Sequence, residues 1–124
     1  MPATSKEAAA EQDFGLAVDR SAQLDGYTVN FVSIRETHSL KDMLVGLPGS
    51  HCRCPHWGYM VSGRMTVDYD DSHEEYGAGD AFYMPPGHIP TADAGSEFVI
   101  FSPAAELAAT EEAIAAYMQQ RANA

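Results

Sequence analysis

Between residues 27 and 102, short runs of β-branched and aromatic residues alternate with turn residues at intervals of about ten positions. The run YTVNFVSIRE is typical of a strand covered on both faces, and AFYM and SEFVIFS are shorter runs of the same kind. Gly63 interrupts the long extended segment HWGYMVSGRMTVDYD. This spacing predicts an all-β sandwich or barrel. Because 124 residues can enclose one core but not two, a single architecture should account for the whole chain.

The two ends of the chain differ from this central region. Residues 1–22 are rich in Ala, Glu, Ser and Gln and show little apolar periodicity, which predicts a flexible N-terminal segment. Near the other end, Ser102 can cap a helix and Pro103 suits its first position. The apolar residues that follow recur at helical spacing: Leu107, Ile114, Tyr117 and Met118. We therefore expect a helix over 104–119 and three parts, namely 1–22, a barrel over 23–103, and an amphipathic helical segment over 104–124.

The charge of the chain excludes some classes of partner. The sequence contains eighteen Asp and Glu residues and seven Lys and Arg residues, which gives a formal net charge of -11, and it has no basic run. Such a surface repels phosphate backbones and anionic lipids, so we expect neither nucleic acid nor membrane partners. The sequence shows neither a signal-peptide core nor an apolar stretch of about 20 residues, so the expected location is the cytoplasm. Two cysteines in that reducing compartment are expected as thiols or metal ligands.

Both cysteines lie in the segment HCRCPH, residues 51–56, together with two histidines. On a regular strand Cys52, Cys54 and His56 share one face. Their spacing disfavours a disulfide, because Cβ atoms two positions apart on a strand are separated by about 7 Å. Cys54 and His56 can reach one ion. Cys52 can join them only if Pro55 bends the strand, since an extended chain would place it about 13 Å from His56.

The segment HCRCPHWGYMVSG, followed by GDAFYMPPGH, resembles the two motifs of the cupin superfamily, RmlC-like jelly-roll barrels. It is most similar to small single-domain bacterial cupins that read C-x-x-P-H-x-G-Y-x-x-x-G and then G-D-x-x-x-x-P-P-G-H. The glutamate position of the ordinary first motif falls on His56, and its second histidine position falls on Cys52 or His51. The histidine position of the second motif falls on Pro90, and the nearby histidine is His88. The resemblance implies an all-β double-stranded β-helix (jelly-roll) cupin barrel with a C-terminal α-helix.

The motifs and the HCRCPH segment together suggest a metal site inside the barrel. The expected ligands are Cys52, Cys54, His56 and His88. His51 would replace a cysteine if the strand bulged. Thiolate and imidazole ligands favour Zn²⁺, with Fe, Ni or Co as lesser candidates. In the alternative interpretation His56 and His88 form a buried hydrogen-bonded pair and the cysteines are small apolar fillers. His38 and His73 are expected in solvated positions.

Three functions are compatible with such a site. The first is a metal-dependent enzyme acting on a small organic molecule in the barrel pocket, which needs a coordination position left open by three protein ligands. The second is a non-catalytic module that senses a small molecule or a metal. The third is a barrel whose metal is purely structural, closed by four ligands. No nucleophile and base pair stands out in the sequence. We expect a small-molecule ligand and a homodimer, since association would cover open sheet edges and an apolar helix face.

Overall fold

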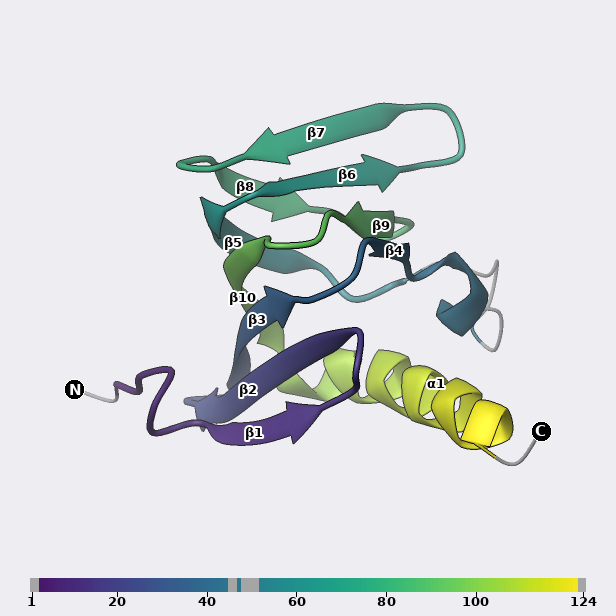
Figure 1. Cartoon of the computed structure of the whole chain (residues 1–124). Helices are drawn as coiled ribbons and strands as arrows, with labels where there is room; N and C mark the ends of the chain where they lie inside the picture. Colours follow the sequence, from purple (N-terminus) through teal and green to yellow (C-terminus); the bar gives the residue numbers. More distant parts are fainter. Residues whose placement is uncertain (1–2, 45–46, 48–51, 123–124) are drawn as a thin grey trace.

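The computed structural model describes residues 3–44, 47 and 52–122. Within them the chain forms ten strands, a short 3₁₀ helix η1 (Lys41–Leu44) and one α-helix, α1 (Ala104–Ala122) (Figure 1). The strands are β1 (Ala10–Asp13), β2 (Ala17–Leu24), β3 (Tyr27–Ile34), β4 (His38–Ser39), β5 (His56–Ser62), β6 (Arg64–Asp68), β7 (His73–Gly77), β8 (Ala81–Met84), β9 (Ile89–Ala92) and β10 (Glu97–Pro103). The chain is therefore mostly β with a C-terminal helix, as the sequence predicted.

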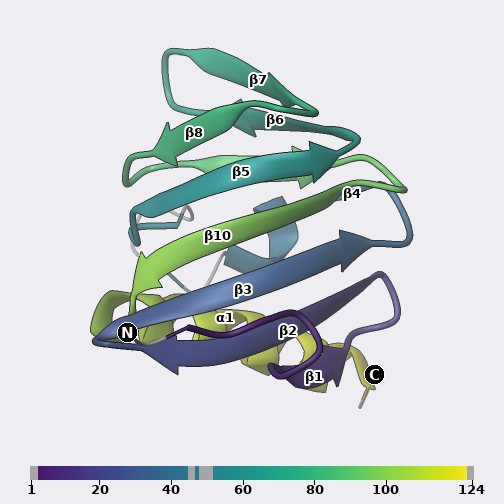
Figure 2. The ribbon, with the colours of Figure 1, turned by 90° about the vertical axis from the view of Figure 1, so that its left-hand side faces the viewer.

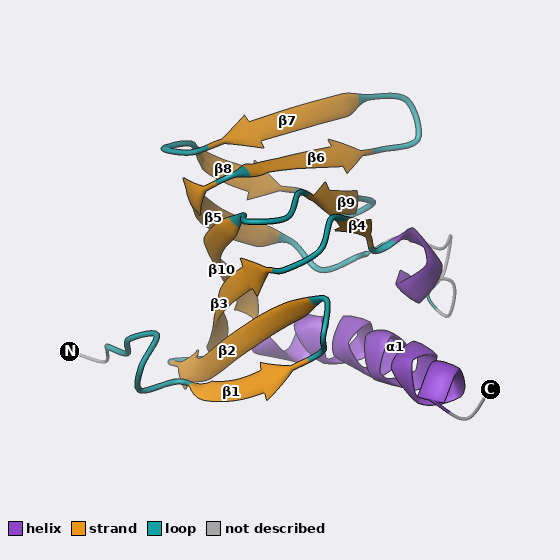
Figure 3. Ribbon diagram, in the orientation of Figure 1, coloured by secondary structure: helices purple, strands orange, loops and turns teal. Residues whose placement is uncertain are grey.

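The strands form two antiparallel sheets that share one core (Figure 3). The larger sheet has the order β1-β2-β3-β10-β5-β8, and the smaller has the order β4-β9-β6-β7. Alternate side chains of both sheets point inward, because successive residues of a strand face opposite sides. They meet in one buried apolar cluster, formed by Ile34, Met60, Met65, Val67, Tyr76, Phe82, Met84, Ala92 and Phe98. The arrangement fits a jelly roll built as two packed sheets.

The expected closed barrel is not formed within the described residues. In that part of the chain β8 pairs with β5 and β7 pairs with β6, and no named strand of one sheet is paired with a strand of the other. The two sheets are instead held together by their shared apolar core and by the connections between them. The prediction of a jelly-roll architecture thus holds at the level of strands and layers, whereas closure by hydrogen bonds does not.

The prediction of a flexible segment over residues 1–22 is wrong where β1 and β2 lie. Strand β2 pairs with β3 along its whole length, from Ala17 opposite Ile34 to Leu24 opposite Tyr27. Strand β1 then pairs with β2 and is exposed throughout. An exposed edge strand needs no apolar periodicity, because its hydrogen bonds to the neighbouring strand hold it in place. Composition alone therefore could not reveal these two strands.

The C-terminal helix was predicted over 104–119 and extends from Ala104 to Ala122. It covers one end of the two sheets beside η1 (Figure 1). Ser102, which the sequence suggested as its cap, is instead a buried residue of β10 that pairs with β3 as far as Pro103. In the described part of the chain neither helix combines the length and the apolar character that a membrane span requires.

Figure 2 shows the larger sheet from its outer side, with β3, β10 and β5 side by side. Several exposed apolar side chains lie on this outer face. They are Tyr27, Trp57, Tyr59, Val61, Tyr83 and Phe101. Trp57 lies against Tyr83, with the ring centroids 5.1 Å apart, and is paired with Phe101 across the strands. On the outward positions of β3, β10, β5 and β8 the one charged residue is Glu97, which accepts a hydrogen bond from Lys6. We call these six apolar residues the outer aromatic face.

Candidate metal centre

The segment before β5 is bent, and the bend determines which side chains meet. Two backbone hydrogen bonds hold Cys52 beside the loop after β8: its N–H donates to the carbonyl of His88 at 3.0 Å, and its carbonyl accepts from Gly87 at 2.7 Å. The chain bends at Cys54, and regular strand begins at His56. The Sγ of Cys52 consequently lies 3.6 Å from the Nε2 of His56. This is the bend on which the predicted participation of Cys52 depended.

The loop that supplies the second histidine follows β8 directly. Met84, the last residue of β8, pairs with His56 across the sheet. Pro85 and Pro86 then end the strand, since proline cannot donate to a ladder. The Nδ1–H of His88 donates to the carbonyl of Pro85 at 2.6 Å, which fixes the orientation of the ring. As a result the two imidazole rings lie with their centroids 4.9 Å apart.

Three of the expected ligands form one group. Within the described residues, the ligand atoms of Cys52, His56 and His88 lie within 4.8 Å of one another. All three side chains are buried, with exposed fractions of 2%, 7% and 0%. Two residues from other elements contact the group: Ser102 of β10 lies 2.6 Å from Nδ1 of His56, and the Thr110 hydroxyl of α1 lies 3.3 Å from the sulfur of Cys52. The centre therefore draws on two loops, two strands and the C-terminal helix.

Burial sets the protonation states of this group. Burial, and to a smaller extent the neighbouring His88, lower the pKa of His56 to about 3. Burial also raises the pKa of the Cys52 thiol, with a smaller opposing effect from the Thr110 hydroxyl. Near neutral pH and without a metal, His56 is therefore a neutral imidazole and Cys52 is a protonated thiol. For a cation bound among them, His56 is already deprotonated, whereas the Cys52 thiol can release its proton.

The fourth expected ligand, Cys54, is not part of this group. Its thiol donates to the carbonyl of Pro55 at 3.4 Å, and its side chain is 1% exposed. It packs in a small apolar cluster with Leu44 and Leu107. Burial raises the pKa of Cys54 to about 12, so it remains a thiol. The alternative interpretation of a cysteine as an apolar filler thus fits its surroundings. His51, the other expected substitute, lies outside the described residues.

No pattern in the sequence indicated that Ser102 and Thr110 would contact the site. Both are small hydroxyl residues whose position depends on how β10 and α1 pack. His73, the first residue of β7, is exposed as expected. His38 was expected to be solvated, but it is half-buried and lines a cavity. Its Nδ1–H donates to the carbonyl of Glu36 at 2.7 Å.

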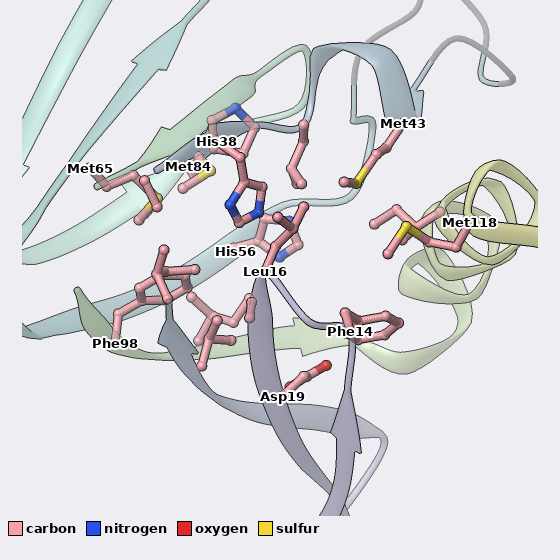
Figure 4. A pocket seen from close by; sticks show the side chains of 18 residues that line it. Phe14, Leu16, Asp19, His38, Met43, His56, Met65, Met84, Phe98 and Met118 are labelled. Atoms are coloured by element: carbon pink, nitrogen blue, oxygen red, sulfur yellow. The ribbon is translucent and has the colours of Figure 1, made fainter. Parts of the chain in front are cut away.

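The cavity lies between the sheets and helix α1 and has a volume of about 190 Å³ (Figure 4). Its wall is mostly apolar, with Met65 and Met84 on one side and Met43 and Met118 on the other. His56 also lines it, so this side chain belongs both to the Cys52, His56 and His88 group and to the cavity wall. A small molecule in the cavity would therefore lie beside the candidate metal centre.

A model of the family described as "Cupin domain" matches residues 45–91. No curated protein matches the chain. Among solved structures it is similar to an RmlC-like cupin from Shewanella frigidimarina NCIMB 400, with a TM-score of 0.57 and 18% identity over 81% of this chain and 88% of that one. It is also similar to the polyketide cyclase RemF from Streptomyces resistomycificus, with a TM-score of 0.58 and 17% identity over 83% of this chain and 79% of that one.

A third similar structure is the S161A mutant of Bacillus subtilis oxalate decarboxylase OxdC, with a TM-score of 0.60 and 15% identity. The match covers 81% of this chain but 28% of that longer chain. At these identities the likeness to solved structures concerns the fold. The neighbours include proteins with different activities, so the shared fold does not assign one of these activities to this chain.

Proposed function

We propose that this chain, which belongs to the cupin superfamily, binds one divalent transition-metal ion through Cys52, His56 and His88, beside a pocket for a small organic molecule. The observation that carries the proposal is the 3.6 Å separation of the Cys52 sulfur and the His56 Nε2, within a group that also contains His88. Typical zinc bond lengths to sulfur and nitrogen place two ligands of a tetrahedral site about 3.6 Å apart. The protein thus holds these two atoms at a separation that suits an ion.

The hydrogen bonds behind the two imidazoles also suit a metal site. The Nδ1–H of His88 donates to Pro85, so Nε2 carries the lone pair of the neutral ring. Nδ1 of His56 is 2.6 Å from the Ser102 hydroxyl, and donation to that oxygen puts its lone pair on Nε2 as well. Ligating histidines in proteins are usually oriented by such a bond from the other ring nitrogen. Both rings are therefore oriented before an ion binds.

The donor set indicates which ions would be preferred. One thiolate and two imidazoles favour Zn²⁺, with Fe, Ni or Co as weaker candidates. When bound, such an ion can polarise a carbonyl or supply hydroxide to a small molecule. Cys52 would have to give up its proton, and the adjacent Thr110 hydroxyl can donate a hydrogen bond to the resulting thiolate. His56 links the ion to the cavity because its ring lines the wall.

The number of ligands bears on whether the ion would be structural. A structural zinc site normally has four protein ligands, whereas a functional site keeps one position open. Among the residues that the structure describes, the group contains three His, Cys, Asp or Glu ligands. This count favours an ion that can also take water or a small molecule. X-ray absorption of the zinc-loaded protein would test it, since four protein ligands would make the ion structural.

The metal proposal is tested by elemental analysis of the purified chain and three variants. His56→Ala and His88→Ala should lose bound metal, whereas His73→Ala should keep it because His73 is exposed and distant from the group. Zinc should raise the melting temperature of the wild type and of His73→Ala, since an ion that binds only the folded chain stabilises it. Circular dichroism would check that the variants are folded.

Two results would contradict the proposal. One is a folded His56→Ala or His88→Ala protein that holds as much metal as His73→Ala. The other is a wild type that takes up no metal after incubation with Zn²⁺, Ni²⁺ or anaerobic Fe²⁺. In either case the three side chains would be a buried hydrogen-bonded cluster.

A further inference from the structure

The composition of the cavity wall restricts what could bind there. Four methionines from four different elements line it, with Phe14 and Phe98, and its volume is about 190 Å³. Methionine side chains are flexible and polarisable, so such a wall can adapt to an apolar ligand of varied shape. An apolar cavity of about 150 Å³ is known to accept benzene. The space between the sheets therefore suits a molecule with about one ring.

The polar groups of the cavity are few and consist mainly of hydrogen-bond acceptors. Apart from His56 they are Asp19 and His38, and no described residue of the lining is Lys or Arg. The Asn30 amide donates to both carboxylate oxygens of Asp19 at 3.0 Å, and each oxygen keeps lone pairs for further donors. Burial raises the pKa of Asp19, more than the hydrogen bond from Asn30 lowers it. A further hydrogen-bond donor would therefore stabilise the charged form of the Asp19 carboxylate.

His38 adds a second acceptor. Because its Nδ1–H donates to the Glu36 carbonyl, the other ring nitrogen of the neutral imidazole carries a lone pair. An anionic ligand would meet the Asp19 carboxylate in an apolar space without a lysine or arginine to offset the charge. The formal net charge of -11 opposes the approach of anions as well.

We propose that the cavity binds an uncharged, mainly apolar molecule of about one-ring size that carries one hydroxyl or N–H donor, held by Asp19. This inference rests on the proposed function, because it names the class of molecule for the same pocket. It does not require the metal, since Asp19 is not one of the residues of the Cys52, His56 and His88 group. Carboxylates and phosphate esters are excluded as ligands of the metal-free cavity by the same chemistry.

The test is calorimetric titration of the full chain with phenol, benzene and benzoate, both after chelator treatment and after zinc loading. Phenol should bind both forms, and benzoate should bind the chelator-treated form at least about tenfold more weakly because the metal-free cavity has no lysine or arginine to pair with it. In Asp19→Asn the preference for phenol over benzene should fall by about fivefold, since a hydrogen bond to a neutral acceptor is weaker than one to a carboxylate. The loss of preference separates a contact with the ligand from a general effect on folding.

A pair of variants on one strand tests the location. Ile100 lines the cavity, whereas its neighbour Val99 points to the outer side of the same sheet. Ile100→Phe should fill the cavity and weaken phenol binding at least about tenfold, whereas Val99→Phe should leave it within about twofold. Urea unfolding of both variants would check that each is folded.

The proposal is overturned if benzoate binds the chelator-treated chain as well as phenol does, if Ile100→Phe binds phenol normally, or if phenol shows no binding up to about 10 mM. Failure of the metal proposal would be seen separately, as phenol binding by a chain that takes up no zinc. Conversely, zinc uptake without phenol binding would contradict the proposed class of ligand but not the proposed metal site.

Discussion

The sulfur of Cys52 lies 3.6 Å from the Nε2 of His56, although an extended chain would separate the two residues by about 13 Å. Cys54 packs in the same small apolar cluster as Cys52, Leu44 and Leu107, but its sulfur is not part of the group that contains the two imidazoles. Two cysteines that are equivalent by strand alternation thus differ in whether their sulfur reaches the histidines.

The two cysteines should respond differently to the same substitution. Cys52→Ser should weaken zinc binding by more than about a hundredfold, because it removes a thiolate ligand. Cys54→Ser should change zinc affinity by less than about threefold, because its sulfur is outside the group. Competition with a coloured chelator at fixed pH would measure both affinities. Equal losses in the two folded variants would show that Cys54 is also a ligand.

Zinc affinity should increase with pH by about tenfold per unit between about pH 6 and 8. Burial raises the pKa of Cys52, so the thiol is protonated throughout this range and releases one proton when the ion binds. His56, whose pKa is about 3, has no proton to release there. Titrations at several pH values would give the slope. A change of slope near pH 6.5 would instead indicate a histidine with an ordinary pKa.

The metal-free protein should lose stability in acid through His56. Its pKa is about 3 in the folded chain and about 6.5 when unfolded, so the unfolded state binds more protons between these values. The contribution is complete above about pH 6.5 and is lost as the pH falls toward 3, by roughly 5 kcal/mol in total. Urea unfolding of the metal-free chain from pH 7 to pH 4 would measure it. A folded His56→Gln variant should show a flatter profile, and an equally steep one would contradict the assignment to His56.

Two glycines with positive φ should tolerate alanine differently. Gly63, between β5 and β6, has φ +79°, and an added Cβ would lie 2.5 Å from Cα of the buried Ser96. Gly79 has φ +91°, but its Cβ would meet nothing within 4 Å. Gly79→Ala should cost about 1 kcal/mol from backbone strain, whereas Gly63→Ala should cost more than about 3 kcal/mol because the hairpin must also shift. Denaturant unfolding would compare them, and equal costs would count against the close contact.

The outer aromatic face should be the surface through which two copies associate, and we propose the homodimer on this basis. Glu97 is the one charged residue on the outward positions of its four strands, and it is paired with Lys6. In a chain with a formal net charge of -11, this face can meet its own copy without opposing carboxylates. Sedimentation of the wild type should show a dimer.

Variants of that face provide the matching control. Trp57→Lys places a charge at its centre and should give a monomer, whereas Asp70→Lys, in the exposed turn between β6 and β7, should remain dimeric. A wild type that sediments as a monomer at micromolar concentration, or a dimer unaffected by Trp57→Lys, would contradict this interface.

The strands with apolar alternation and the C-terminal helix could be predicted from the sequence, because burial of one side of an element leaves a period in the chain itself. Strand β3, strand β10 and helix α1 fall where this period placed them. The motif residues His56 and His88 could likewise be recognised locally, since His56 follows Pro55 directly and His88 follows Pro85, Pro86 and Gly87.

Only the tertiary structure decided which side chains surround those histidines. Cys52 is held by backbone hydrogen bonds to Gly87 and His88, and helix α1 places the Thr110 hydroxyl beside its sulfur. The same holds for the N-terminal strands, because β2 is stabilised by pairing with β3, and the exposed β1 by pairing with β2, rather than by an apolar pattern of their own. A sequence reveals which residues are suited to burial. Which of them meet depends on contacts between distant segments, and these leave no periodic trace in the chain.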